Sequence, residues 1–94
     1  MSQHTYTCAP YSVLTGWDRP LGQFFLVISL AGTVEYSNLD DPQATPTGGL
    51  SLEQIQARLR EWHLRVPDGL LTALEEDRRA DRGSHARQWT LPPA

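Results

Sequence analysis

A short apolar run at residues 24–30 constrains the fold of this 94-residue chain more than any other feature. The run is well below the roughly 18 residues that a membrane-spanning helix needs, and its β-branched and aromatic residues are typical of a buried strand. Phe24 and Leu26 would point to one face of such a strand, and Phe25 and Val27 to the other. A chain of this size cannot easily cover both apolar faces, and we therefore predict a homodimer through a face or an edge of the sheet.

Several other segments have the composition of strands or loops. A turn at Ala31 and Gly32 precedes a stretch of alternating polar and apolar residues, which predicts a hairpin with the apolar strand. The N-terminal stretch is strand-like, but Pro10 interrupts it because proline lacks a donor N–H. The predicted elements are a weak N-terminal strand within residues 2–15, strands at 23–30, 33–37 and 86–91, and loops at 16–22 and 38–49.

The clearest helix signal begins at Ser51. Ser51 and Gln54 have the spacing of a capping box, and Leu50 and Ile55 have that of the matching hydrophobic staple. Apolar residues then recur at helical spacing on one face as far as Trp62, which assigns Trp62 to the core. We predict a helix over residues 51–63.

A second helix is predicted over residues 68–82. It begins either with Pro67 near its first position or with Asp68 as its cap. Gly83 is the expected residue after its end, where glycine tolerates the left-handed conformation.

These elements predict an α+β fold. We expect a small antiparallel sheet of three or four strands, with the two short helices packed on one face as an αα-hairpin. Residues 1–94 should form a single domain, because two domains of half this length would each be too small to bury a core.

The charge of the chain bears on its partners. Eleven acidic and eight basic residues give a formal net charge of −3 and a pI near 5.4, and every basic residue is arginine. Binders of nucleic acid or of anionic membrane surfaces are usually basic, so the overall charge disfavours nucleic acid and membranes as partners. The first residues lack the basic and then apolar pattern of a secretory signal. We therefore expect a cytoplasmic protein, of bacterial or phage type.

Motifs for catalysis, metals or cofactors are missing from the sequence. Cys8 is the only cysteine, and the three histidines match no zinc-binding spacing with it. We predict an inert, buried thiol, no metal and no cofactor. The loop acids Asp18, Asp40 and Asp41 are expected to cap turns. No phosphate-binding loop or nucleophile elbow is present, and we predict that the protein is not an enzyme.

Aromatic and basic residues give candidate partner-binding positions. Trp17 and Arg19 lie in the predicted loop at 16–22, and an exposed tryptophan beside arginine has the composition of an interface anchor. Alternatively, Trp17 folds back as a lid over the core. Trp89 in the last strand could belong to the core or to an interface. The favoured function is a small non-catalytic protein-interaction, regulatory or accessory factor whose protein partner is unknown.

Two alternative functions stay open. A nucleic-acid-associated factor would use the arginine-rich C-terminal region, with Arg78, Arg79, Arg82 and Arg87 as contacts, and its binding would depend steeply on salt. A small ligand-binding protein would use the loops at 16–22 and 38–49, and a metabolite would then raise its melting temperature.

Overall fold

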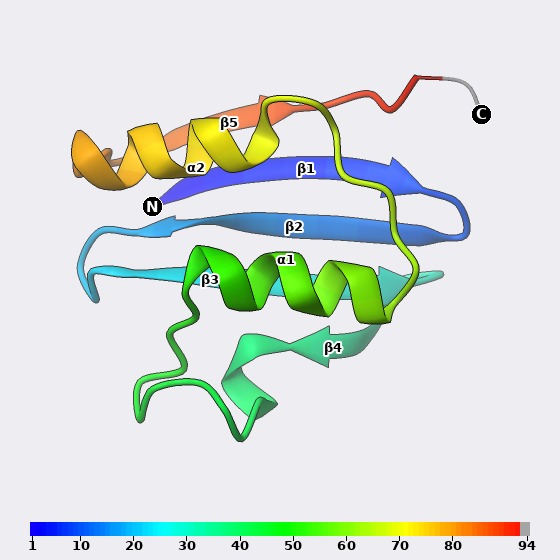
Figure 1. Cartoon of the computed structure of the whole chain (residues 1–94), viewed down its shortest axis with the longest axis horizontal. Coiled ribbons are helices and arrows are strands. Elements are labelled where there is room, and N and C mark those ends of the chain that lie inside the picture. The colour runs from blue at the N-terminus through cyan, green and yellow to red at the C-terminus, as the bar shows by residue number, and fades with distance from the viewer. Residues whose placement is uncertain (93–94) are drawn as a thin grey trace.

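The computed structural model describes residues 1–92, which form five strands, two α-helices and one short 3-10 helix. The fold is α+β, as the sequence predicts, and Figure 1 shows both α-helices on one face of the sheet. In chain order the elements are β1 (Ser2–Cys8), β2 (Tyr11–Asp18), β3 (Gln23–Leu30), β4 (Thr33–Ser37), η1 (Asn38–Asp40), α1 (Leu52–Glu61), α2 (Leu70–Arg79) and β5 (His85–Gln88).

The sheet has five strands in the order β4-β3-β2-β1-β5, so β4 and β5 are its edges. The prediction of three or four antiparallel strands was wrong in two respects. The N-terminal stretch forms two strands rather than one, because Pro10 lies in the turn between β1 and β2, where its missing N–H costs no ladder bond. In addition, β5 pairs with β1 in parallel, whereas the other neighbours are antiparallel.

Strand β2 extends further than the sequence predicts. It continues through Gly16 and Trp17, which were expected to lie in a loop, and it pairs with β3 as far as Asp18. Gly16 is a packing residue here: a Cβ at this position would lie 2.0 Å from the carbonyl oxygen of Ser2 and 2.8 Å from the ring of Phe25. The glycine therefore marks close packing inside a strand rather than a turn.

The helix boundaries confirm one start signal and correct the other. At α1, the Ser51 Oγ accepts from the Gln54 backbone N at 3.1 Å, and the Ser51 N donates to the Gln54 side chain at 2.8 Å, so the predicted capping box forms. The α2 helix instead begins after Gly69, which has a φ of 90° and no side-chain cap. It ends at Arg79, and Asp81 rather than Gly83 takes the left-handed conformation after it.

The main core lies between the sheet and the two helices. Helix α1 packs on β3, helix α2 packs on β2, and residues 62–69 connect the two helices. Each helix therefore packs on the sheet, and these contacts do not establish the predicted αα-hairpin. The opposite face of the sheet carries Leu14 and Val27 among hydroxyl side chains, and the Phe25 ring lies over Gly16. No helix within residues 1–92 is long and apolar enough to cross a membrane. The fully buried apolar core residues are Val13, Leu26, Ile28, Ile55, Leu59, Leu70 and Leu74.

Candidate functional site

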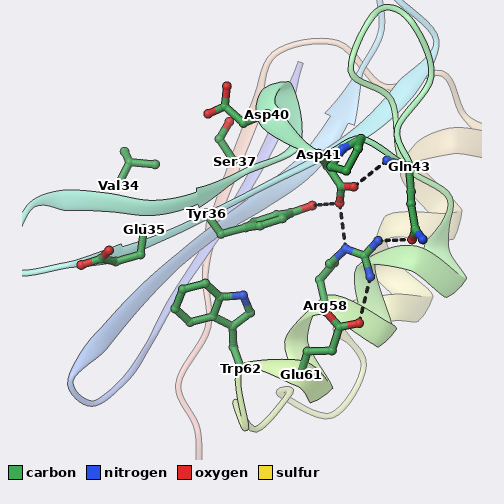
Figure 2. Close-up of a pocket in the computed structure, with 11 residues that line it drawn as sticks. Val34, Glu35, Tyr36, Ser37, Asp40, Asp41, Gln43, Arg58, Glu61 and Trp62 are labelled. Carbon is green, nitrogen blue, oxygen red and sulfur yellow. Dashed lines mark hydrogen bonds and ion pairs between the residues drawn. The ribbon is translucent and has the colours of Figure 1, made fainter.

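A pocket of about 530 Å³ opens between edge strand β4 and helix α1, and we call it the Tyr36 pocket (Figure 2). Strand β4 and the chain that follows it supply one wall, and α1 with the residue after it supplies the other. The lining residues are Val34, Glu35, Tyr36, Ser37, Asp40, Asp41, Pro42, Gln43, Arg58, Glu61 and Trp62.

The base of the Tyr36 pocket is a bonded cluster around Asp41. Its Oδ2 accepts from the Tyr36 hydroxyl at 2.6 Å and from the Arg58 Nε at 2.7 Å, and its Oδ1 accepts from the Gln43 backbone N at 2.8 Å. Arg58 also donates to the Glu61 carboxylate at 3.0 Å and to the Gln43 side chain. The side chains of Asp41 and Arg58 are only 3% and 12% exposed. The cluster therefore clamps the loop after β4 onto α1.

Proton affinities in this cluster follow from its hydrogen bonds. The Arg58 guanidinium, helped by the Tyr36 hydroxyl, lowers the pKa of Asp41 to about 2. Burial raises the pKa of Tyr36, and the bond to the Asp41 carboxylate raises it further. At neutral pH the carboxylate is ionised and both its oxygens accept hydrogen bonds, so Asp41 braces the loop. Sequence analysis expected only a turn-capping role, which the bond to Gln43 N fulfils.

The remaining lining of the pocket is aromatic and acidic. Figure 2 shows Trp62 beside Tyr36. Trp62 also contacts Tyr11 edge-to-face, with ring centroids 5.7 Å apart. Glu35 and Asp40 are exposed, and neither has an ion-pair partner within residues 1–92. With four carboxylates and one guanidinium in its lining, the pocket has a formal charge of −3.

A second pocket, of about 570 Å³, lies beside Trp17, and we call it the Trp17 pocket. It brings together the two loops that the ligand-binding hypothesis named, since Gly22 and Gly49 both line it. The Gln23 side chain, at the start of β3, donates to the Thr47 carbonyl at 2.9 Å and holds the second loop against the residue that follows the first. Its lining is more apolar than that of the Tyr36 pocket.

Two predicted site residues, Trp17 and Arg19, converge on Asp81. Trp17 is only 8% exposed, packs edge-to-face on Phe24 at 5.0 Å, and donates through its Nε1 to the Asp81 carboxylate at 3.0 Å. Arg19 is exposed and lies 3.3 Å from the same carboxylate. The burial of Trp17 fits the alternative in which it covers the core.

Trp89 belongs to a buried network centred on His4, which is 1% exposed. The Trp89 Nε1 donates to the His4 Nδ1 at 2.9 Å, and the His4 Nε2 lies 2.7 Å from the Asp77 Oδ2. Because an indole N–H can only donate, His4 accepts at Nδ1 and donates from Nε2. The Arg82 Nε binds the other Asp77 oxygen at 2.7 Å, and the Arg87 guanidinium lies 3.8 Å from the Trp89 ring centre.

This histidine and aspartate resemble an acid–base pair only in composition, since both nitrogens of His4 are already bonded within the fold. The network ties β5 and the residue after it to β1 and α2. Sequence analysis missed it, because His4 and Asp77 are 73 positions apart and neither lies in a local motif.

The other predicted arginines are paired on the surface of α2. Arg78 donates twice to Glu75, and the Arg79 Nε lies 3.5 Å from the same carboxylate. With Arg82 bound to Asp77, three of the four arginines of the nucleic-acid hypothesis have an acidic neighbour, and the fourth, Arg87, stacks on Trp89. Their pairing lowers the positive charge that this region presents to an anionic partner.

Cys8 is half-buried rather than fully buried, because it lies at the end of β1 at the margin of the core. In the part of the chain that the structure describes, no group of three or more His, Cys, Asp or Glu side chains could hold a metal ion.

Comparisons of the chain with protein-family models, with curated proteins and with solved structures find no match.

Proposed function

We propose that this chain is a small non-catalytic protein-interaction factor that binds its partner through the Tyr36 pocket. The observation that carries the proposal is the pocket itself: a concave surface at the open edge of the sheet, with aromatic walls and two unpaired carboxylates among residues 1–92. Aromatic side chains in such a hollow are typical anchors of protein interfaces. The proposed role is regulatory or accessory and cytoplasmic, in a bacterial or phage setting.

A non-catalytic role is supported by how the titratable groups are used. The Asp41 carboxylate accepts from three donors, and His4 is bonded at both of its nitrogens. A general base needs a free lone pair within reach of a substrate proton. In both clusters the basic groups are engaged in hydrogen bonds that hold the fold together.

Charge-reversal variants test this proposal. Tagged wild-type protein would be crosslinked in extract of its native host, and the partner yield compared with that of Glu35→Arg and of Glu76→Arg. Both glutamates are exposed, but only Glu35 lines the pocket. We expect the first variant to lose the partner and the second to keep it. Equal yields from all three proteins would contradict the proposal.

We also propose that the chain forms a homodimer through the sheet face opposite the helices. This face carries Leu14 and Val27 among uncharged side chains, and Phe25 lies on it against Gly16. Light scattering at tens of micromolar should give twice the chain mass, and Val27→Glu should restore the monomer. A monomer at every concentration of the wild-type protein would refute this.

A small ligand in the Trp17 pocket is the second candidate function. The two loops named by that hypothesis meet at this pocket, whose volume and apolar floor suit a small organic molecule. A thermal-shift screen with a metabolite panel tests it, because a ligand that binds the native state raises the melting temperature. The nucleic-acid alternative is weakened by the ion pairs of Arg78, Arg79 and Arg82.

A further inference from the structure

We infer that the Tyr36 pocket recognises an arginine side chain carried by a segment of the partner protein. This inference rests on the proposed function, and it names the chemical group that the pocket accepts. Three features support it: the aromatic walls of the pocket, the charge of its rim, and the fixed arrangement of its base.

The aromatic walls suit a flat cation. Tyr36 and Trp62 both line the hollow, and Figure 2 shows them side by side. A guanidinium stacks on the face of tyrosine or tryptophan through its charge and its plane. The same chain already contains such a contact, since the Arg87 guanidinium lies 3.8 Å from the centre of the Trp89 ring.

The rim supplies charge complementarity. Asp41 is neutralised by Arg58, which also pairs with Glu61. Glu35 and Asp40 are exposed and have no such partner among residues 1–92. Two unpaired carboxylates in the lining of the same pocket as the aromatic rings attract a cation and repel phosphate or carboxylate ligands. A guanidinium has five donors in one plane and can bind a carboxylate with two hydrogen bonds, whereas an ammonium group cannot do so in the same flat geometry.

The base of the pocket is set before any ligand arrives. The bonds from Tyr36 and Arg58 to Asp41 fix the Tyr36 ring and the loop after β4. Little side-chain entropy is then lost when a cation enters, which favours binding. A second copy of this chain is a poorer source of the cation, because five of its eight arginines are in ion pairs. Of the other three, Arg65 donates to a backbone carbonyl and Arg87 stacks on Trp89, which leaves Arg60 as the one arginine without a partner among residues 1–92.

Short peptides provide the test. Three capped pentapeptides would differ only at the central residue, which is arginine, lysine or citrulline, the last having nearly the shape of arginine without its charge. Each would be titrated into ¹⁵N-labelled protein and followed by amide and indole shifts. We expect the arginine peptide to shift the signals of Tyr36, Trp62 and their neighbours, and to bind about tenfold more tightly than the citrulline peptide. The lysine peptide should bind more weakly than the arginine peptide.

Matched variants show whether the rim is responsible. Glu35→Gln and Asp40→Asn should each weaken the arginine peptide severalfold, while Glu76→Gln, which removes the same charge from the exposed side of α2, should leave its binding unchanged. Raising the salt concentration should weaken binding to the wild-type protein, because the rim carboxylates are exposed.

Several results would overturn the inference. They are equal binding of the arginine and citrulline peptides, equal binding of arginine and lysine, shifts outside the pocket, or no effect of either rim variant. A different result refutes the proposed function: the Glu35→Arg variant still captures the cellular partner. A protein that loses its partner with Glu35→Arg but ignores the arginine peptide keeps the proposed function and refutes this inference.

Discussion

The stability of a Trp17→Ala variant tests whether Trp17 is a core residue or an interface anchor. The expected loss of unfolding free energy can be worked out from the structure. A tryptophan side chain has about 200 Å² of surface, and Trp17 is 8% exposed, so nearly all of that area is withdrawn from water. At about 25 cal/mol per Å² the burial is worth roughly 5 kcal/mol. Because Trp17 lines an open pocket, water can enter the space left by Trp17→Ala. We therefore expect a loss near the lower end of the usual range for core aromatics, about 3 kcal/mol.

The control variant is Trp17→Phe. It keeps a ring against Phe24 but removes the Nε1–H that donates to Asp81. Asp81 is exposed, so water can replace this donor, and the cost should stay below about 1 kcal/mol. Urea denaturation followed by far-UV circular dichroism measures both variants, whereas fluorescence would mix in signals from Trp62 and Trp89. A loss under about 1 kcal/mol for Trp17→Ala would refute the assignment to the core and return Trp17 to the role of anchor.

Three further predictions concern stability. The pKa of Asp41 is lowered from 3.8 to about 2, so its ionised form stabilises the fold above pH 4. About 1–2 kcal/mol of unfolding free energy should be lost as the pH falls from 4 to 2. Asp41→Asn should flatten this part of the curve of stability against pH, and an unchanged acid slope would exclude the mechanism. Trp89→Phe leaves the buried His4 Nδ1 without its donor, and should cost about 1–3 kcal/mol by urea denaturation; a variant as stable as the wild type would show that water or another donor replaces the indole. Ser51→Ala removes the acceptor of the capping box and should cost about 1 kcal/mol, so a midpoint identical to that of the wild type would mean that the cap contributes nothing.

The sequence predicted those elements whose signals are local. The apolar run at 23–30, the strand at 33–37 and the capping box at Ser51 lie within a few positions of the residues that they organise. The errors arose where distant parts of the chain decide the structure. Gly16 was assigned to a loop, because its place in a strand depends on the distant Phe25 ring and Ser2 backbone that pack against it. The parallel pairing of β5 with β1 joins the two ends of the chain and has no local signal.

The candidate site was less predictable than the fold. Asp41 was expected to cap a turn and does so, but its bonds to Tyr36 and Arg58 depend on α1 packing beside β4. Trp62 was assigned to the core because of its helical spacing, yet it also lines the pocket. Trp62 follows the last residue of α1 directly, where it contacts Tyr11 edge-to-face and also faces the pocket. Helical spacing shows which face of a helix is apolar, but not where the sheet beneath it ends.

The two proposed interfaces are compatible because they use different faces of one sheet. Glu35 is the middle residue of β4, so a two-fold dimer centred on this edge strand would bring Glu35 of one protomer toward Glu35 of its partner, and such like charges are destabilising. The face opposite the helices has no such charge beside Leu14 and Val27, so a dimer formed there avoids the repulsion. The Tyr36 ring points to the helix side of the sheet, where it bonds to Asp41, and that side stays open in such a dimer. The dimer would therefore present two arginine-binding pockets. A partner with two suitably spaced arginines should have a higher affinity for the dimer than for a monomeric Val27→Glu variant, because binding at the first pocket raises the effective concentration at the second.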